Sequence, residues 1–121
     1  MYPNLKNCTI AIIGLGYVGL PLAIKFAKRQ KSKRDDYFLN RKVIGFDINK
    51  KRIQDLKKGI DLTREISEED ILNSENIKFT YDKSFLVQAD VFIVTVPTPI
   101  DSNKNPDLTF LENASKLVGE A

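Results

Sequence analysis

A glycine-rich turn between an apolar strand and an amphipathic helix constrains the fold of this chain more than any other feature. Residues 9–13 (TIAII) are apolar and rich in β-branched side chains, which predicts a buried strand. Residues 14–19 (GLGYVG) follow directly, and apolar side chains then recur at the four-residue spacing of one helix face. A G-x-G-x-x-G sequence between a strand and a helix is typical of dinucleotide binding.

The three glycines of this turn have different expected roles. We expect Gly14 to allow the sharp turn off the strand, Gly16 to leave room for a pyrophosphate, and Gly19 to let the helix pack closely. The amides of Tyr17 and Val18 then lie in the first helical turn, where N–H groups lack intrahelical partners and the helix dipole attracts anions. The alternative is a turn that merely packs well.

Helices and strands alternate along the rest of the sequence. We interpret the charged segment 30–41 as an inserted surface loop or helix extension, with Tyr37 and Phe38 folding back onto the body. Segment 61–66, which contains Thr63, Arg64 and Glu65, is expected to be either a solvated connection or a ligand-facing loop. The expected helices span residues 17–29, 49–58, 67–73 and 82–88, with a last helix capped by Asp107, and the expected strands span residues 9–13, 42–47, 77–80 and 90–96.

This order of elements predicts a single α/β domain with a Rossmann-like, doubly wound parallel sheet. Right-handed crossovers give the strand order 3-2-1-4, numbered along the chain. Ligands bind where such an order reverses, at the carboxyl ends of the first and fourth strands. We therefore expect Thr95, Val96 and Thr98 to lie in one crevice with the glycine turn. The Thr98 hydroxyl either meets the nicotinamide-side ribose or phosphate or makes a turn hydrogen bond. The apolar run 90–96 predicts a strand covered on both faces.

Asp47 ends the second strand, where dinucleotide folds place a carboxylate on the adenosine ribose. The alternative is that Asp47 only caps the next helix. A carboxylate at this position repels the 2′-phosphate of NADP, which favours NAD. Arg52 complicates this choice, because a nearby arginine can accept a 2′-phosphate, lie against the adenine or reach the ribose.

Composition excludes several classes of protein. Charged residues make up 29% of the 121 residues and apolar residues 42%, and no apolar run approaches a membrane span, so we expect a soluble globular protein. With no histidine and the single Cys8, we expect no metal site and no internal disulfide, which suits the reducing cytoplasm. The first residues lead directly into a strand, so we expect no signal peptide. The basic segment 28–34 lacks interleaved aromatic residues, so we expect no nucleic-acid binding.

Three sequence motifs carry a resemblance to a known family. GLGYVGLPLA (residues 14–23), VIGFDINKKRI (43–53) and VTVPTPID (94–101) resemble the N-terminal NAD-binding domain of the UDP-glucose/GDP-mannose dehydrogenase family. VTVPTPID followed by PDLTFL (106–111) is most similar to the UDP-N-acetylhexosamine 6-dehydrogenase branch, which serves bacterial surface polysaccharide synthesis.

The resemblance implies a reaction and a set of cofactor contacts. Members of this family oxidise the C6 hydroxymethyl of a nucleotide sugar to a carboxylate with two NAD⁺, through a thiohemiacetal on a cysteine. By motif match, the glycines, Tyr17, Val18, Asp47, Arg52 and Thr98 are implied NAD contacts.

The resemblance also implies that residues 1–121 are a fragment. Cys8 lies at the wrong end of the first strand for chemistry, and the catalytic cysteine and the sugar-nucleotide site of the family lie beyond residue 121. We therefore expect the N-terminal part of an NAD-binding domain that is inactive alone, from a parent enzyme that takes a UDP-sugar and forms a homo-oligomer. Two alternatives remain: a stand-alone NAD-sensing module, and another dehydrogenase of the 6-phosphogluconate or hydroxyacid type, against which VTVPTPID argues.

Overall fold

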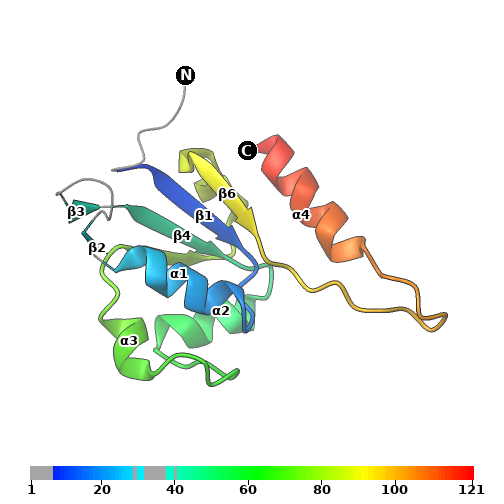
Figure 1. The fold of residues 1–121 in the computed structure, drawn as a ribbon, viewed down its shortest axis with the longest axis horizontal. Coiled ribbons are helices and arrows are strands. Elements are labelled where there is room, and N and C mark those ends of the chain that lie inside the picture. The colour runs from blue at the N-terminus through cyan, green and yellow to red at the C-terminus, as the bar shows by residue number, and fades with distance from the viewer. Residues whose placement is uncertain (1–6, 29, 32–37, 40) are drawn as a thin grey trace.

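A parallel sheet forms the centre of the molecule in the computed structural model, which describes residues 7–28, 30–31, 38–39 and 41–121 (Figure 1). The four strands lie in the order β5-β4-β1-β6. This is the order 3-2-1-4 that the sequence predicts, so the prediction of a doubly wound sheet is confirmed. Their bounds are Thr9–Ile13 (β1), Lys42–Phe46 (β4), Ile77–Thr80 (β5) and Val91–Val94 (β6).

One face of the sheet is covered by three helices that follow the first strands. Because side chains alternate between the faces of a strand, Ile10 and Ile12 point to the same side. There they share a buried cluster with α1 (Gly19–Ala27), α2 (Lys50–Lys57) and α3 (Glu68–Leu72). Figure 1 shows these helices together on one side of the sheet.

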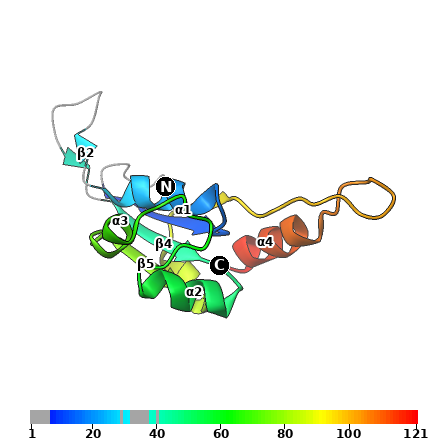
Figure 2. The same cartoon turned by 90° about the horizontal axis from the view of Figure 1, so that it is seen from below.

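The opposite face is covered by the elements that follow β5. Ile13 and Phe46 pack there with Leu86 of the 3₁₀ helix η1 (Lys83–Gln88) and with Ala114 of α4 (Thr109–Glu120). Between β6 and α4 the chain makes a long excursion away from the sheet, which Figure 2 shows as a projecting loop. None of the helices in the described ranges combines the length and apolar character that crossing a bilayer requires.

Several helix ends follow from their capping residues. The Asn49 side chain accepts a hydrogen bond from the Arg52 amide at the start of α2, and Gly59, with φ +82°, follows its end. Ser67 caps α3 in the same way through the Asp70 amide. Asp107 accepts hydrogen bonds from the Thr109 amide and hydroxyl, so it closes the first turn of α4 as expected, from just outside the helix.

The segment after α1 differs from the prediction. Instead of a loop or helix extension, β2 (Gln30–Lys31) and β3 (Phe38–Leu39) form a short antiparallel pair. Alternate polar and apolar residues in so short a stretch give no helical period, and strand pairing satisfies the backbone instead. Arg29 and Tyr37 lie outside the described residues, and with them most of the basic segment and the expected folding back of Tyr37.

Two other boundaries shift. Helix α1 begins at Gly19, because Tyr17 and Val18 form a turn rather than helix. Strand β6 lies at an edge of the sheet and pairs with β1 alone, so its four residues are only half-buried. Its two faces do pack against the two clusters, but the expected full coverage is not reached.

Candidate functional site

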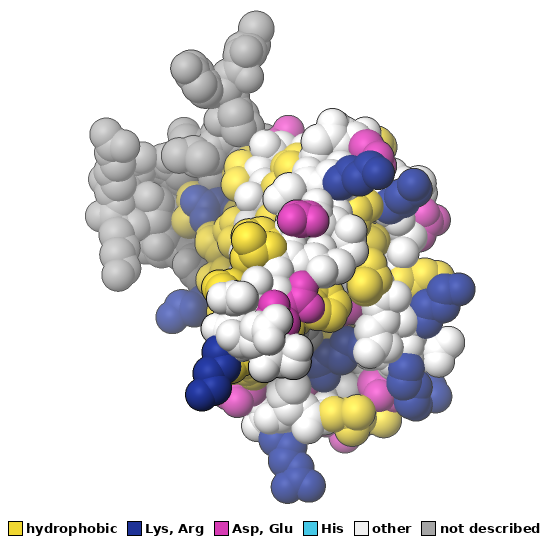
Figure 3. All heavy atoms as spheres, turned by 90° about the vertical axis from the view of Figure 1, so that its right-hand side faces the viewer, with side chains coloured by type: hydrophobic (Ala, Val, Ile, Leu, Met, Phe, Trp, Pro, Cys, Tyr) yellow, Lys and Arg dark blue, Asp and Glu magenta, His cyan; other side chains and the backbone are white. Residues whose placement is uncertain are grey.

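A cavity of about 890 Å³ opens at the carboxyl ends of β1, β4 and β6, where the strand order reverses. The glycine turn, residues 46–49, Arg52, residues 95–99 and one side of α4 line it. All predicted cofactor residues except Gly19 are in this lining: Gly14, Gly16, Tyr17, Val18, Asp47, Arg52, Thr95, Val96 and Thr98. Figure 3 views the molecule from this side, where basic and acidic side chains are scattered rather than gathered by sign.

The packing of the protein itself requires two of the three glycines. Gly14 has φ +100°, and a Cβ built on it would lie 2.8 Å from the Thr95 carbonyl oxygen. A Cβ on Gly19 would overlap the Gly14 carbonyl oxygen and the Thr95 hydroxyl. The Thr95 hydroxyl donates a hydrogen bond to that same carbonyl at 2.7 Å. Thr95 therefore ties the end of β6 to the glycine turn, and Gly19 is needed for helix packing rather than for the cavity wall.

Gly16 differs, because no protein atom lies within 4 Å of a Cβ built on it. The turn therefore leaves open space in front of the backbone at this position. Beside it, the Tyr17 and Val18 side chains are exposed, and no described residue accepts a hydrogen bond from the amide of either. The first turn of α1 contains no acidic residue, so the positive end of its dipole is not compensated there. This geometry suits an anion at the turn.

Asp47 joins the second strand to the glycine turn. One carboxylate oxygen accepts a hydrogen bond from the Leu15 amide and the other from the Asn49 amide, each at 2.9 Å. Each oxygen keeps a further lone pair, so the carboxylate can still accept from a ribose hydroxyl. Asn49, not Asp47, caps α2, so the alternative of Asp47 as a simple helix cap is wrong.

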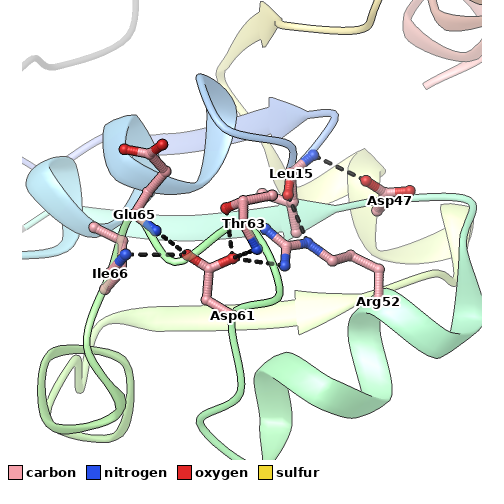
Figure 4. Close-up of polar contacts among 7 residues, drawn as sticks. All are labelled: Leu15, Asp47, Arg52, Asp61, Thr63, Glu65 and Ile66. Carbon is pink, nitrogen blue, oxygen red and sulfur yellow. Dashed lines mark hydrogen bonds and ion pairs between the residues drawn. The ribbon is translucent and has the colours of Figure 1, made fainter.

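Arg52 supports the same turn from below (Figure 4). Its Nε donates to the Leu15 carbonyl oxygen at 2.8 Å, and its Nη1 donates to Asp61 Oδ1 at 2.8 Å. Its Nη2 is buried and has no acceptor among the described residues. The peptide groups on both sides of Leu15 are thus bound by side chains of the second β-α unit, one by Asp47 and one by Arg52.

The sequence analysis did not identify Asp61. Its fully buried carboxylate accepts hydrogen bonds from Arg52, the Thr63 amide and hydroxyl, and the amides of Glu65 and Ile66 (Figure 4). Burial by itself raises the pKa of Asp61, but the hydrogen bonds from Thr63, Arg52 and Ile66 lower it to about 2.

Segment 61–66 is therefore neither of the two expected kinds of loop. Its exposed side chains surround one buried acid, and the Thr63 hydroxyl and Glu65 amide face that acid. The sequence contained one usable signal, the spacing Asp61-Leu62-Thr63, because aspartate often binds the amide two residues ahead.

Thr98 and Val96 lie in the loop after β6. The exposed Thr98 hydroxyl makes no hydrogen bond with any residue that the structure describes, so the expected turn bond is not formed there. Val96 is half-buried, and its Cγ1 lies 3.2 Å from a Cβ built on Gly14, so Val96 packs against the glycine turn.

Comparison with known proteins agrees with this architecture. The chain is 45% identical over 116 residues to UDP-N-acetyl-D-glucosamine 6-dehydrogenase of Pseudomonas aeruginosa and 48% identical to the Salmonella typhi enzyme of that name, covering 96% of this chain and 25% of each relative. The solved UDP-D-ManNAc dehydrogenase of Pyrococcus horikoshii matches with a TM-score of 0.74 and 34% identity, over 93% of this chain and 25% of that one. The chain thus spans about a quarter of the length of these relatives.

A family model also matches residues 8–121, and it describes the NAD binding domain of the UDP-glucose/GDP-mannose dehydrogenases. The cofactor of that domain is NAD, and the glycine turn, Asp47 and the cavity lie within the matched residues. This chain belongs to the UDP-glucose/GDP-mannose dehydrogenase family.

Proposed function

We propose that residues 1–121 form the N-terminal part of the NAD-binding domain of a nucleotide-sugar 6-dehydrogenase, with its catalytic and sugar-nucleotide domains outside this chain. The parent protein would oxidise the C6 hydroxymethyl of a UDP-N-acetylhexosamine to a carboxylate with two NAD⁺, for a surface polysaccharide. The names of the similar bacterial enzymes support the substrate class. By the same analogy the parent protein is a cytoplasmic homo-oligomer.

The observation that carries the proposal is the open space at Gly16. Packing within the protein explains Gly14 and Gly19 but not Gly16, whose Cβ would meet nothing. A ligand that approaches the backbone there would explain it, and the unpaired amides of Tyr17 and Val18 suit a pyrophosphate. The cavity volume of about 890 Å³ is in the range of small-molecule and cofactor sites.

The other cavity residues can then be given roles in holding NAD. The Asp47 carboxylate accepts from the adenosine ribose hydroxyls while it keeps the Leu15 amide in place. Thr98 offers its hydroxyl on the opposite side of the crevice, and Thr95 and Val96 shape the wall behind the pyrophosphate. When bound, NAD⁺ supplies the hydride acceptor, and the residues of this chain bind and orient it.

The test is a calorimetric titration of the full-length protein with NAD⁺, repeated on Gly16→Ala and on Gly119→Ala. A methyl group at Gly16 should lower the affinity for NAD⁺ by about tenfold or more, because it occupies the space of the pyrophosphate. Gly119 is the matched control, since its Cβ would also meet no atom within 4 Å and it lies outside the cavity lining. Equal NAD⁺ affinity in the two variants would contradict the assignment.

Turnover is measured separately. Incubation of the same protein with NAD⁺ and UDP-N-acetylglucosamine or its epimers should yield two NADH per sugar oxidised. Binding of NAD⁺ without oxidation of any UDP-sugar would favour the alternative of an NAD-sensing module. One NADH per sugar would contradict oxidation to the carboxylate.

A further inference from the structure

The charged side chains beside the glycine turn bear on which dinucleotide the cavity accepts, a question that rests on the function proposed above. Asp47 and Arg52 both line the cavity. A carboxylate at this position disfavours the 2′-phosphate of NADP, whereas an arginine nearby favours it. The two side chains therefore act in opposite directions, and the outcome depends on whether the Arg52 guanidinium is available.

In the structure, the Arg52 guanidinium is not available to a ligand. Its Nε is bonded to the Leu15 carbonyl oxygen, its Nη1 is bonded to Asp61, and its Nη2 is buried. Only 10% of the side chain is exposed. A phosphate group in the cavity could meet this guanidinium only if the side chain first left both of its acceptors.

Asp61 makes that movement costly. Its carboxylate is fully buried, and the backbone of residues 61–66 is wrapped around it by hydrogen bonds to Thr63, Glu65 and Ile66. With its pKa at about 2, Asp61 is ionised at neutral pH. Departure of Arg52 would leave a buried carboxylate without its countercharge, which is strongly unfavourable.

We propose that Asp61 is a specificity-determining positioning residue: by holding Arg52 inward against the glycine turn, it denies the 2′-phosphate of NADP a partner and makes the cavity select NAD. Asp47 repels the phosphate from the cavity wall, and Asp61 removes the one nearby cation that would offset this repulsion. The side chain that sets the preference thus lies outside the cavity lining and acts through Arg52.

The test measures the dissociation constants for NAD⁺ and, by competition, for NADP⁺ in the full-length protein and in four variants. Asp61→Asn should lower the ratio of the NADP⁺ constant to the NAD⁺ constant by about tenfold, because one charged hydrogen-bond donor becomes free to move. In an Arg52→Ala background, Asp61→Asn should leave that ratio unchanged, since its effect passes through Arg52. Thr63→Ala is the matched control, because it removes a hydrogen bond to the same carboxylate oxygen but keeps the charge pair.

Arg52→Ala by itself tests the proposal even where Asp61→Asn does not fold. It should weaken both dinucleotides alike and leave the ratio within about twofold, because the held guanidinium gives NADP⁺ no advantage. A selective loss of NADP⁺ in Arg52→Ala would overturn the proposal, as would an unchanged ratio in folded Asp61→Asn or an equal change without Arg52. Failure of the unmodified protein to bind NAD⁺ would instead contradict the proposed function.

Discussion

At the scale of single residues, Asp47 has a structural task in addition to its proposed ribose contact. Asp47→Ala removes the acceptor of the Leu15 and Asn49 amides, so we expect a loss of about 1–3 kcal/mol in the free energy of unfolding. Asp47→Asn keeps one amide oxygen as an acceptor and should cost less. Urea unfolding of the two variants measures the difference, and equal stability of Asp47→Ala and the unmodified chain would show that these bonds contribute little.

The glycines give a second residue-scale prediction, on stability rather than on binding. Gly19→Ala should lower the free energy of unfolding by about 3 kcal/mol, because its Cβ overlaps backbone atoms of Gly14 that cannot move aside. Gly16→Ala should change it by less than about 0.5 kcal/mol, since its Cβ meets no atom. Thermal unfolding of the two variants separates them. A similar cost at both positions would mean that Gly16, too, is required by packing.

At the scale of elements, segment 61–66 should make the fold sensitive to acid. The folded-state pKa of Asp61 is about 2, below its ordinary value of 3.8. A depressed pKa stabilises the fold at pH values above the ordinary value, and this contribution is lost as the pH falls through the folded-state value. That difference in pKa corresponds to about 2 kcal/mol.

Comparison of the unmodified chain with Asp61→Asn isolates this contribution from that of other acids. The variant should be less stable at neutral pH, and the two stabilities should converge as the pH is lowered from about 4 to about 2, where Asp61 becomes protonated. Urea unfolding at a series of pH values measures the convergence. A difference in stability that is constant down to pH 2 would contradict the role of the Asp61 charge.

The same elements show what sequence reasoning can reach. Hydrophobic periodicity and capping residues predicted β1, β4, α2 and α3, because those signals are local. Asp61 could not be predicted with confidence, because its burial depends on Arg52 reaching it from another element. The β2–β3 pair was missed for a related reason, since two-residue strands exist only through their partner.

At the scale of the whole molecule, the handedness of the crossovers was enough to place distant segments together. Right-handed connections put the ends of β1 and β6 side by side, so the glycine turn and residues 95–99 were expected in one crevice, and both line the cavity. What the crossovers could not predict is how the charged side chains are shared. Asp47 and Arg52 were read as ligand contacts, yet both also bind the Leu15 backbone.

The sheet edge gives the last prediction. Strand β6 is apolar throughout but only half-buried, and among the described strands it pairs with β1 alone. An apolar strand with an unpaired edge readily adds another strand. We therefore expect residues 1–121, expressed alone, to self-associate with increasing concentration in sedimentation velocity. Ile93→Lys should oppose this association because it places a charge on the edge strand, whereas Val87→Lys, on exposed η1, should leave it unchanged. A clean monomer at high concentration would show that the β6 edge is protected without a partner.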